Sequence, residues 1–140
     1  MNIAARLPAT EERVPKNTSS KVNHRIQGRT LHDVSRFIGA DPVFIDERIR
    51  QLKREWDIER TLEANAASLG LAGLALGSFV DRRFLILPAL VSAFLLQHAL
   101  QGWCPPIPLF RRLGVRTQRE IARERYALKA LRGEIGRAHV

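Results

Sequence analysis

Charged and apolar residues occupy different parts of this 140-residue chain. Two stretches, 64–80 and 84–110, contain no Asp, Glu, Lys or Arg, and only the tripeptide "DRR" separates them. A membrane-spanning helix needs roughly 20 apolar residues, and both stretches come close to that length. Three residues can join two adjacent antiparallel helices. The pattern predicts a transmembrane hairpin over 64–103, with spans at 64–80 and 84–103 and a turn at 81–83.

A soluble helical core is the alternative interpretation of the same stretches. Helices that are apolar on every side must be covered on every side, and the rest of the chain offers only one or two further helices. We therefore expect a membrane hairpin.

An amphipathic helix is expected ahead of the first span. Asp41 followed by Pro42 is a strong helix start. From there, apolar residues recur at helical spacing among charged ones, with no break before Ala64. Region 31–63 is therefore predicted to be a cytoplasmic helical lead-in, whose apolar stripe rests on a partner helix or on the membrane interface.

The N-terminal region differs from this lead-in. Residues 1–30 are polar, are interrupted by Pro8, Pro15 and Gly28, and show no helical periodicity. They are expected to form a disordered basic arm.

The region after the second span begins with three prolines. Because they remove backbone donors and favour extended predecessors, residues 104–116 are expected to be a non-helical exit along the interface. Thr117 and Glu120 then have the spacing of a capping box, and Gly133 fits a helix end. Region 117–140 is predicted to be a cytoplasmic helix and tail, which makes the fold class all-α.

The net charge of +9 is concentrated outside the apolar stretches. Lysines and arginines flank both ends of the predicted hairpin, whereas its turn has only Arg82 and Arg83. Because cytoplasmic flanks carry the positive excess, both termini are expected in the cytoplasm. Trp103, Arg111 and Arg112 would anchor the second span at the interface. Anionic lipids then account for the basic flanks, and no nucleic acid is needed as a partner.

Small and polar residues inside the spans are candidate functional positions. Small residues recur along the first span and allow close helix approach, within the hairpin or between two copies of the chain: Ala66, Gly70, Gly73 and Gly77. Polar groups inside a span suggest either function or a hydrogen bond made at the interface or between helices: Asn65, Gln97, His98 and Gln101.

Cys104 is the single cysteine of the chain, which excludes an intramolecular disulfide and a multi-cysteine zinc site. Two interpretations remain open. Arg111 and Arg112 could lower its pKa and make it a reactive thiol, or it could be a small apolar residue of the exit. No metal or cofactor is expected.

Four segments, "EWDIERTLEANA", "FLLQHALQGWCPP", "RRLGVRT" and "ALKALRG", resemble the YgaP-like transmembrane-domain family of bacterial inner-membrane proteins, a domain of unknown function. The likeness covers roughly residues 55–118, and its matching positions are Cys104, Pro105, Leu113, Gly114 and Thr117. It implies a self-associating membrane hairpin in the bacterial inner membrane. Some relatives also carry a rhodanese domain with a persulfide-bearing cysteine. This chain has no second cysteine and is too short to include that domain.

Three functions follow as hypotheses. The first is a non-enzymatic anchoring and self-associating scaffold that meets lipid and an unidentified protein partner. The second is a thiol or sulfur relay through Cys104 at the membrane surface. The third is a component of an oligomeric pore or transporter. No catalytic triad, carboxylate pair, phosphate loop or nucleotide fingerprint is present in the sequence.

Overall fold

The computed structural model describes residue 9 and residues 11–133, and all regular elements in this part of the chain are helical. The all-α prediction is confirmed. In chain order the elements are α1 (Arg13–Lys16), α2 (Ser20–Ser35), α3 (Pro42–Arg54), α4 (Ile58–Phe79), the 3-10 helix η2 (Arg82–Leu85), α5 (Ile86–Gln101), α6 (Pro106–Arg112) and α7 (Gln118–Leu131).

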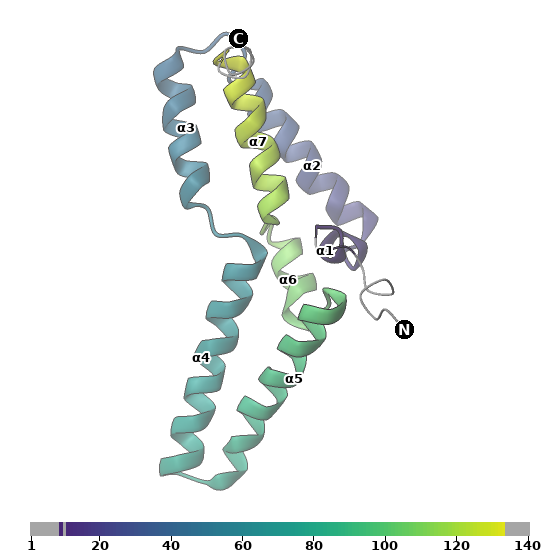
Figure 1. The fold of residues 1–140 in the computed structure, drawn as a ribbon, viewed down its shortest axis with the longest axis vertical. Helices are drawn as coiled ribbons and strands as arrows, with labels where there is room; N and C mark the ends of the chain where they lie inside the picture. The colour runs from purple at the N-terminus through teal and green to yellow at the C-terminus, as the bar shows by residue number, and fades with distance from the viewer. Residues whose placement is uncertain (1–8, 10, 134–140) are drawn as a thin grey trace.

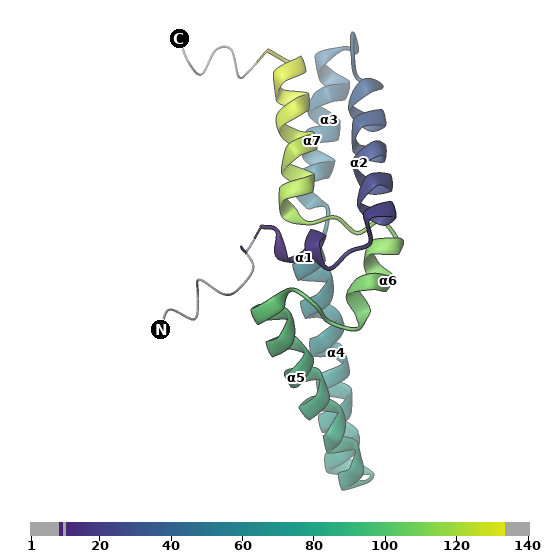
Figure 2. The ribbon, with the colours of Figure 1, turned by 90° about the vertical axis from the view of Figure 1, so that its right-hand side faces the viewer.

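Three parts make up the molecule (Figure 1). Helices α2, α3 and α7 form a bundle, called the head. Helices α4 and α5, joined through η2, form a hairpin that projects from it. Helices α1 and α6 lie at the neck, where the hairpin meets the head, and Figure 2 shows α6 beside the first turns of α4.

The head is organised around one apolar cluster. Buried residues of α3 and α7 pack together, and Phe37 and Ala40 cover the cluster from the α2–α3 connection: Ile45, Ile49, Leu52, Ile121 and Leu128. The predicted helix start at Asp41 is confirmed, since the Asp41 carboxylate accepts a hydrogen bond from the Val43 amide at 2.9 Å. The predicted capping box of Thr117 and Glu120 is present at the start of α7.

The prediction of a disordered arm was wrong for the described residues after position 10. Ser19 caps α2, and only Val22 and Ile26 of this helix are buried apolar residues. The rest of its inward face is polar, so the hydrophobic spacing that marks an amphipathic helix is absent. Positions 1–8 and 10 of the predicted arm lie outside the described residues.

The prediction of an uninterrupted lead-in helix was also wrong. The backbone is extended at Glu55, and Asp57 caps a new helix by accepting a hydrogen bond from the Arg60 amide at 2.8 Å. The Ile58 amide donates to the carbonyl of Arg116 at 2.9 Å, outside any helix. This break separates the head from the hairpin.

The exit after the second span was predicted to be non-helical, yet α6 begins there at Pro106. Prolines are tolerated in the first turn of a helix, where the backbone amides have no intrahelical acceptor. Gly102 and Gly114 bracket this segment, and both have positive φ. Region 104–116 is thus a short helix between two glycine turns. Of the final segment, residues 134–140 lie outside the described part.

The hairpin has a tight tip. Asp81 follows α4, and its carboxylate accepts a hydrogen bond from the Arg83 amide at 3.0 Å as η2 begins. Among the described residues, one helical stretch, Arg82–Gln101, is long and apolar enough to cross a membrane. It is 20 residues long and almost none of it is buried within the molecule.

Candidate functional site

The outer surface of the hairpin is its most unusual feature. Large apolar side chains on both helices and at the tip are exposed: Leu69, Leu71, Leu74, Leu76, Phe79, Val80, Phe84, Leu85, Ile86, Leu90, Phe94, Leu96 and Leu100. Helices that pack in water normally turn such residues inward. In this hairpin the apolar side chains surround the helix pair.

Small residues of α4 allow the close approach of α5 and of η2 at the tip. A Cβ added at Gly73 would stand 2.6 Å from Cδ of Pro88, and one added at Gly77 would stand 2.7 Å from Cγ of Leu85. Gly70, by contrast, has open space around it. Of the two uses predicted for the small residues, Gly73 and Gly77 therefore serve packing within the hairpin.

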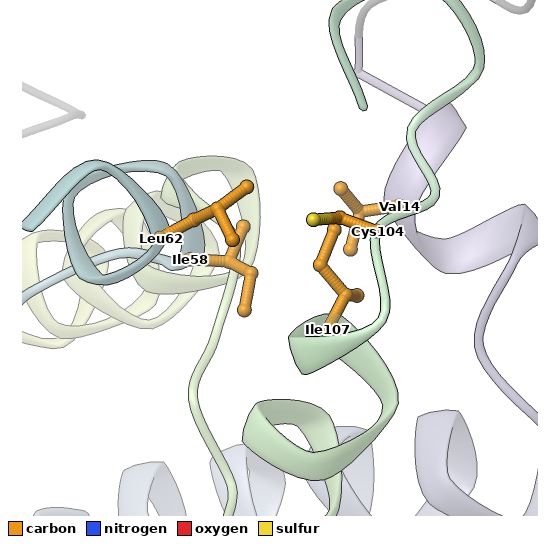
Figure 3. Packing of buried hydrophobic residues seen from close by; sticks show 5 residues of the cluster. All are labelled: Val14, Ile58, Leu62, Cys104 and Ile107. Atoms are coloured by element: carbon orange, nitrogen blue, oxygen red, sulfur yellow. The ribbon is translucent and has the colours of Figure 1, made fainter. Parts of the chain in front are cut away.

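Cys104 belongs to an apolar cluster at the neck. Figure 3 shows Val14, Cys104 and Ile107 facing Ile58 and Leu62, with the sulfur directed toward the α4 side chains. Only 4% of Cys104 is exposed, and burial raises the pKa of its thiol. The hypothesis that nearby arginines lower this pKa is wrong, because the thiol is surrounded by hydrocarbon. A raised pKa leaves little thiolate at neutral pH, which makes the thiol a poor nucleophile.

His98 lies at the neck end of α5 and is buried. Its Nε2 atom is 2.6 Å from Oε2 of Glu59 on α4, so the inter-helix hydrogen bond considered for it is found. Arg13 of α1 donates to Glu59 Oε1 at 2.8 Å and to the carbonyl of Ala99 at 3.1 Å. The hydrogen bond with His98 and the contact with Arg13 lower the pKa of Glu59, against the opposite effect of partial burial. These contacts join α1, α4 and α5.

The close approach of α1 depends on Gly102. Its φ is +76°, and an added Cβ would stand 2.6 Å from Cβ of Arg13. Asn17 donates to the carbonyl of Gln101 at 2.7 Å beside it. The short helix α1 is therefore fastened across the end of α5.

The remaining polar candidates of the spans make local contacts. The amide of Gln97 donates to Gln101 at 2.6 Å along one face of α5. Asn65 is half-buried in α4, and Trp103 is partly exposed after α5. The polar residues predicted inside the spans thus lie near the neck ends of the helices.

Arg111 was predicted to anchor the chain in the interface, and this was wrong. Its exposed fraction is 0%, and its guanidinium makes two hydrogen bonds to the carboxylate of Glu120, at 2.7 and 2.8 Å. It also donates to Thr18 at 3.1 Å and to Asn23 at 2.9 Å. Arg111 therefore fastens α6 to α2 and α7. Arg112, its neighbour, is exposed.

A second buried arginine was missed by sequence reasoning. Arg116 donates to Glu124 at 2.5 Å, to Glu55 at 2.5 and 2.9 Å, and to Thr30 at 3.1 Å. Glu124 is fully buried and also accepts from Arg48 at 2.9 Å. Burial of the guanidinium disfavours its charge, but its hydrogen bonds to Glu55 and Glu124 outweigh this and raise the pKa of Arg116.

These buried carboxylates are paired with arginines rather than poised as acids or bases. Buried ion pairs of this kind fix the arrangement of the elements that they join, and each becomes costly if one partner is removed. Among residues 9 and 11–133, no group of three or more His, Cys, Asp or Glu side chains is placed to hold a metal ion. The chemistry of the head and neck is therefore that of structural ion pairs.

Comparisons with known proteins add no relative: no family model matches the chain, and neither a curated protein nor a solved structure matches it. The likeness to the YgaP-like family stays a prediction from the four sequence segments.

Proposed function

We propose that this chain is a small integral membrane protein, whose hairpin crosses the bilayer and whose head stays in the cytoplasm as an anchored scaffold. The observation that carries the proposal is the apolar outer surface of α4 and α5. A soluble monomer rarely exposes a contiguous apolar patch of more than a few hundred Å². Lipid hydrocarbon would cover this surface, and both helices satisfy their backbone hydrogen bonds internally, as a spanning segment must.

Both helices are proposed to cross. The stretch Arg82–Gln101 has the length and composition of a span. Helix α4 packs against α5 and meets it at the tip, so the two helices should reach the same depth. The charge-free part of α4, 64–79, is about 24 Å long at 1.5 Å per residue, against about 30 Å of hydrocarbon. Arg82 and Arg83 at the tip can extend to the head groups and close this gap.

The charge distribution supports an orientation with both termini in the cytoplasm of a bacterial cell. The head and neck carry most of the lysines and arginines, and the tip carries only Arg82 and Arg83. Positive loops stay on the cytoplasmic side. Anionic lipids of that leaflet are the proposed partners of the exposed cations, together with a protein that docks on the head.

Extraction of native membranes with alkaline carbonate tests the anchoring proposal. The wild-type chain should stay in the membrane pellet, whereas Leu74→Arg with Leu90→Arg, which places charge on the outer surface of both hairpin helices, should prevent stable insertion. Leu31→Arg is the control, because Leu31 is an exposed leucine of the head. Release of the wild-type chain by carbonate would contradict the proposal, as would insertion of the double variant.

Self-association is the second part of the proposal, and Gly70 is the position that can carry it. The space beside Gly73 is filled by α5 and that beside Gly77 by Leu85 of η2, whereas Gly70 is open to a neighbouring molecule. Gly70→Leu should reduce association in a membrane two-hybrid assay without loss of the inserted chain. Unchanged association would show that the face of α4 that carries Gly70 does not mediate self-association.

A further inference from the structure

Helix α6 has two faces of opposite character. Ile107 and Arg111, one turn apart, are both fully buried. Leu109 and Leu113, also one turn apart, are exposed to 58% and 69%. The two leucines lie on the side of the helix that faces away from the neck cluster. This leaves a short apolar strip on the surface that nothing in the described chain covers.

The strip lies on a helix that packs directly against the hairpin. Helix α6 follows α5 after a short connection that contains the exposed Trp103, and it packs against α4. Figure 2 shows it on one flank of the neck, between the hairpin and α2. A bilayer that surrounds the hairpin therefore reaches α6 at its head-group layer, where tryptophan is common.

Three arginines gather at the C-terminal end of this strip. Arg112 and Arg25 are both exposed, and Arg25 donates to the carbonyl of Arg112 at 2.5 Å. A Cβ added at Gly114 would stand 3.0 Å from a guanidinium nitrogen of Arg29, which places this third arginine beside the same turn. Among the described residues, Arg25 and Arg112 form no ion pair, and the nearest carboxylate of Arg29 is Asp33 at 4.0 Å.

From these contacts the geometry points to a second membrane contact on the head: Leu109 and Leu113 enter the boundary between head groups and acyl chains, and Arg25, Arg29 and Arg112 bind the phosphates of anionic lipids. We call these five residues the α6 lipid surface. The inference rests on the proposed function, because an inserted hairpin is what brings the bilayer to α6. The position of α6 against the hairpin, and the positive charges of Arg25 and Arg112, which have no ion-pair partner among the described residues, identify the occupant as an anionic bilayer surface.

The consequence is a preferred orientation of the head. The α6 lipid surface lies on one flank of the neck, and α2 contributes two of its arginines. Binding of lipid there would hold the head by a second point besides the hairpin, so that the outer faces of α3 and α7 point in a fixed direction.

An environment-sensitive fluorophore at position 109 tests the inference. The full chain with Cys104→Ala and Leu109→Cys is labelled and placed in lipid nanodiscs that are either zwitterionic or one-quarter phosphatidylglycerol. We expect blue-shifted emission and quenching by lipid-borne quenchers in the anionic discs. Each arginine near the surface contributes roughly fivefold to binding, so Arg25→Gln with Arg112→Gln should weaken the anionic effect on the order of 25-fold.

Two controls are matched to these variants. The same label at Leu31→Cys, an exposed leucine of the head, should report water in both kinds of disc. Arg36→Gln with Arg50→Gln removes two exposed arginines of the head elsewhere and should leave the signal at position 109 unchanged. Amide hydrogen exchange of residues 109–113 in the unlabelled wild-type chain should show slower exchange in the anionic discs, which checks the result without the Cys104 change.

Each of the other outcomes overturns one specific claim, either of this inference or of the proposed function. A label that reports water in both discs, with the chain still resistant to carbonate, overturns the inference and leaves the proposed function intact. An apolar signal of equal size in both discs overturns the role of the arginines. A signal that depends on protein concentration assigns the surface to a second copy of the chain instead. Extraction of the wild-type chain by carbonate overturns the proposed function itself.

Discussion

The head buries charged side chains beside its apolar cluster, whereas the hairpin buries small residues where its helices meet. In the head, Arg116 and Glu124 are inside the bundle, and Arg111 is buried where α6 meets it. In the hairpin, the residues buried between the helices include Gly73 and Gly77, while leucines and phenylalanines face outward. A protein surrounded only by water would not normally bury arginine and glutamate in one part and expose leucine and phenylalanine over another. The proposed insertion accounts for this contrast, because it places water around the head and lipid around the hairpin.

The two parts also differ in what keeps their helices together. Besides its apolar cluster, the head contains buried ion pairs, and removal of one partner from such a pair is strongly destabilising. If the hairpin is inserted as proposed, it depends on close helix approach, because surrounding hydrocarbon offers no hydrophobic drive for association. A destabilising substitution should therefore act by removing an ion-pair partner in the head and by preventing close helix approach in the hairpin.

The largest loss of stability is expected from Glu124→Gln in the head. This change leaves Arg48 and Arg116 without the buried carboxylate that both contact. Removing one partner of a buried ion pair typically costs about 3–5 kcal/mol. The free energy of unfolding, measured by denaturant titration of the full chain in detergent, should fall by that amount.

Glu47→Gln is the control for this prediction, because Glu47 forms an ion pair of the same type with Arg50 on the exposed side of α3. Almost no change is expected there, since water and salt screen such pairs. Equal losses for the two variants would show that burial of the head's charges contributes nothing to its stability, and the contrast with the hairpin would lose its basis.

A smaller effect is expected from Gly73→Ala in the hairpin. The new methyl group meets Cδ of Pro88 at 2.6 Å and Cβ of Leu87 at 3.0 Å, so α4 and α5 must separate. Overpacking of this kind costs about 1–3 kcal/mol. Gly70→Ala places the same methyl group in open space and should be neutral or stabilising by up to about 1 kcal/mol through helix propensity. If both variants lose stability equally, the glycines do not mediate the helix contact.

The hairpin could be predicted from the sequence because its signal is local. A charge-free stretch, a three-residue interruption and a second charge-free stretch predict two antiparallel helices without knowledge of their surroundings. The cap at Asp41 and the capping box at Thr117 are equally local, since donor and acceptor lie within three residues. Patterns of this kind need no information from the rest of the fold.

The head and neck were harder to predict because their signals are not local. Helix α2 turns Asn23 and Thr30 toward Arg111 and Arg116, about 90 residues away, so its inward face shows no hydrophobic period. Arg111 was mistaken for a lipid anchor because a cation beside an apolar span usually is one. Its partners, Glu120 among them, are identified only once α6 and α7 have been placed.

The neck, where the two parts meet, gives a third prediction through Cys104. Its thiol lies among Val14, Ile58, Leu62 and Ile107. Maleimide can therefore react with it only when the cluster opens. An opening that costs about 1.4 kcal/mol already slows labelling tenfold. We expect labelling in native membranes to be slower than that of Ser35→Cys, an exposed position of the head, measured in a Cys104→Ala chain. Labelling as fast as at position 35 would revive the thiol-relay hypothesis.

The smallest effect concerns the pH dependence of the contact between Glu59 and His98. The pKa of Glu59 is lowered in the folded chain, chiefly by the hydrogen bond to His98 and further by Arg13. A carboxyl group with a lowered folded-state pKa contributes its full stability above its ordinary pKa of about 4.5 and loses it as the pH falls toward the folded-state value. The difference in thermal midpoint between the wild-type chain and Glu59→Gln should therefore be largest at neutral pH and narrow below pH 4.5. Glu63→Gln, the same change one turn further along α4 on an exposed side chain, should give a smaller difference at neutral pH. If the difference in thermal midpoint for Glu59→Gln does not change with pH, the neck depends on the shape of this side chain and not on its charge. Stabilisation by ion pairs would then be confined to the head and would not reach the start of the hairpin.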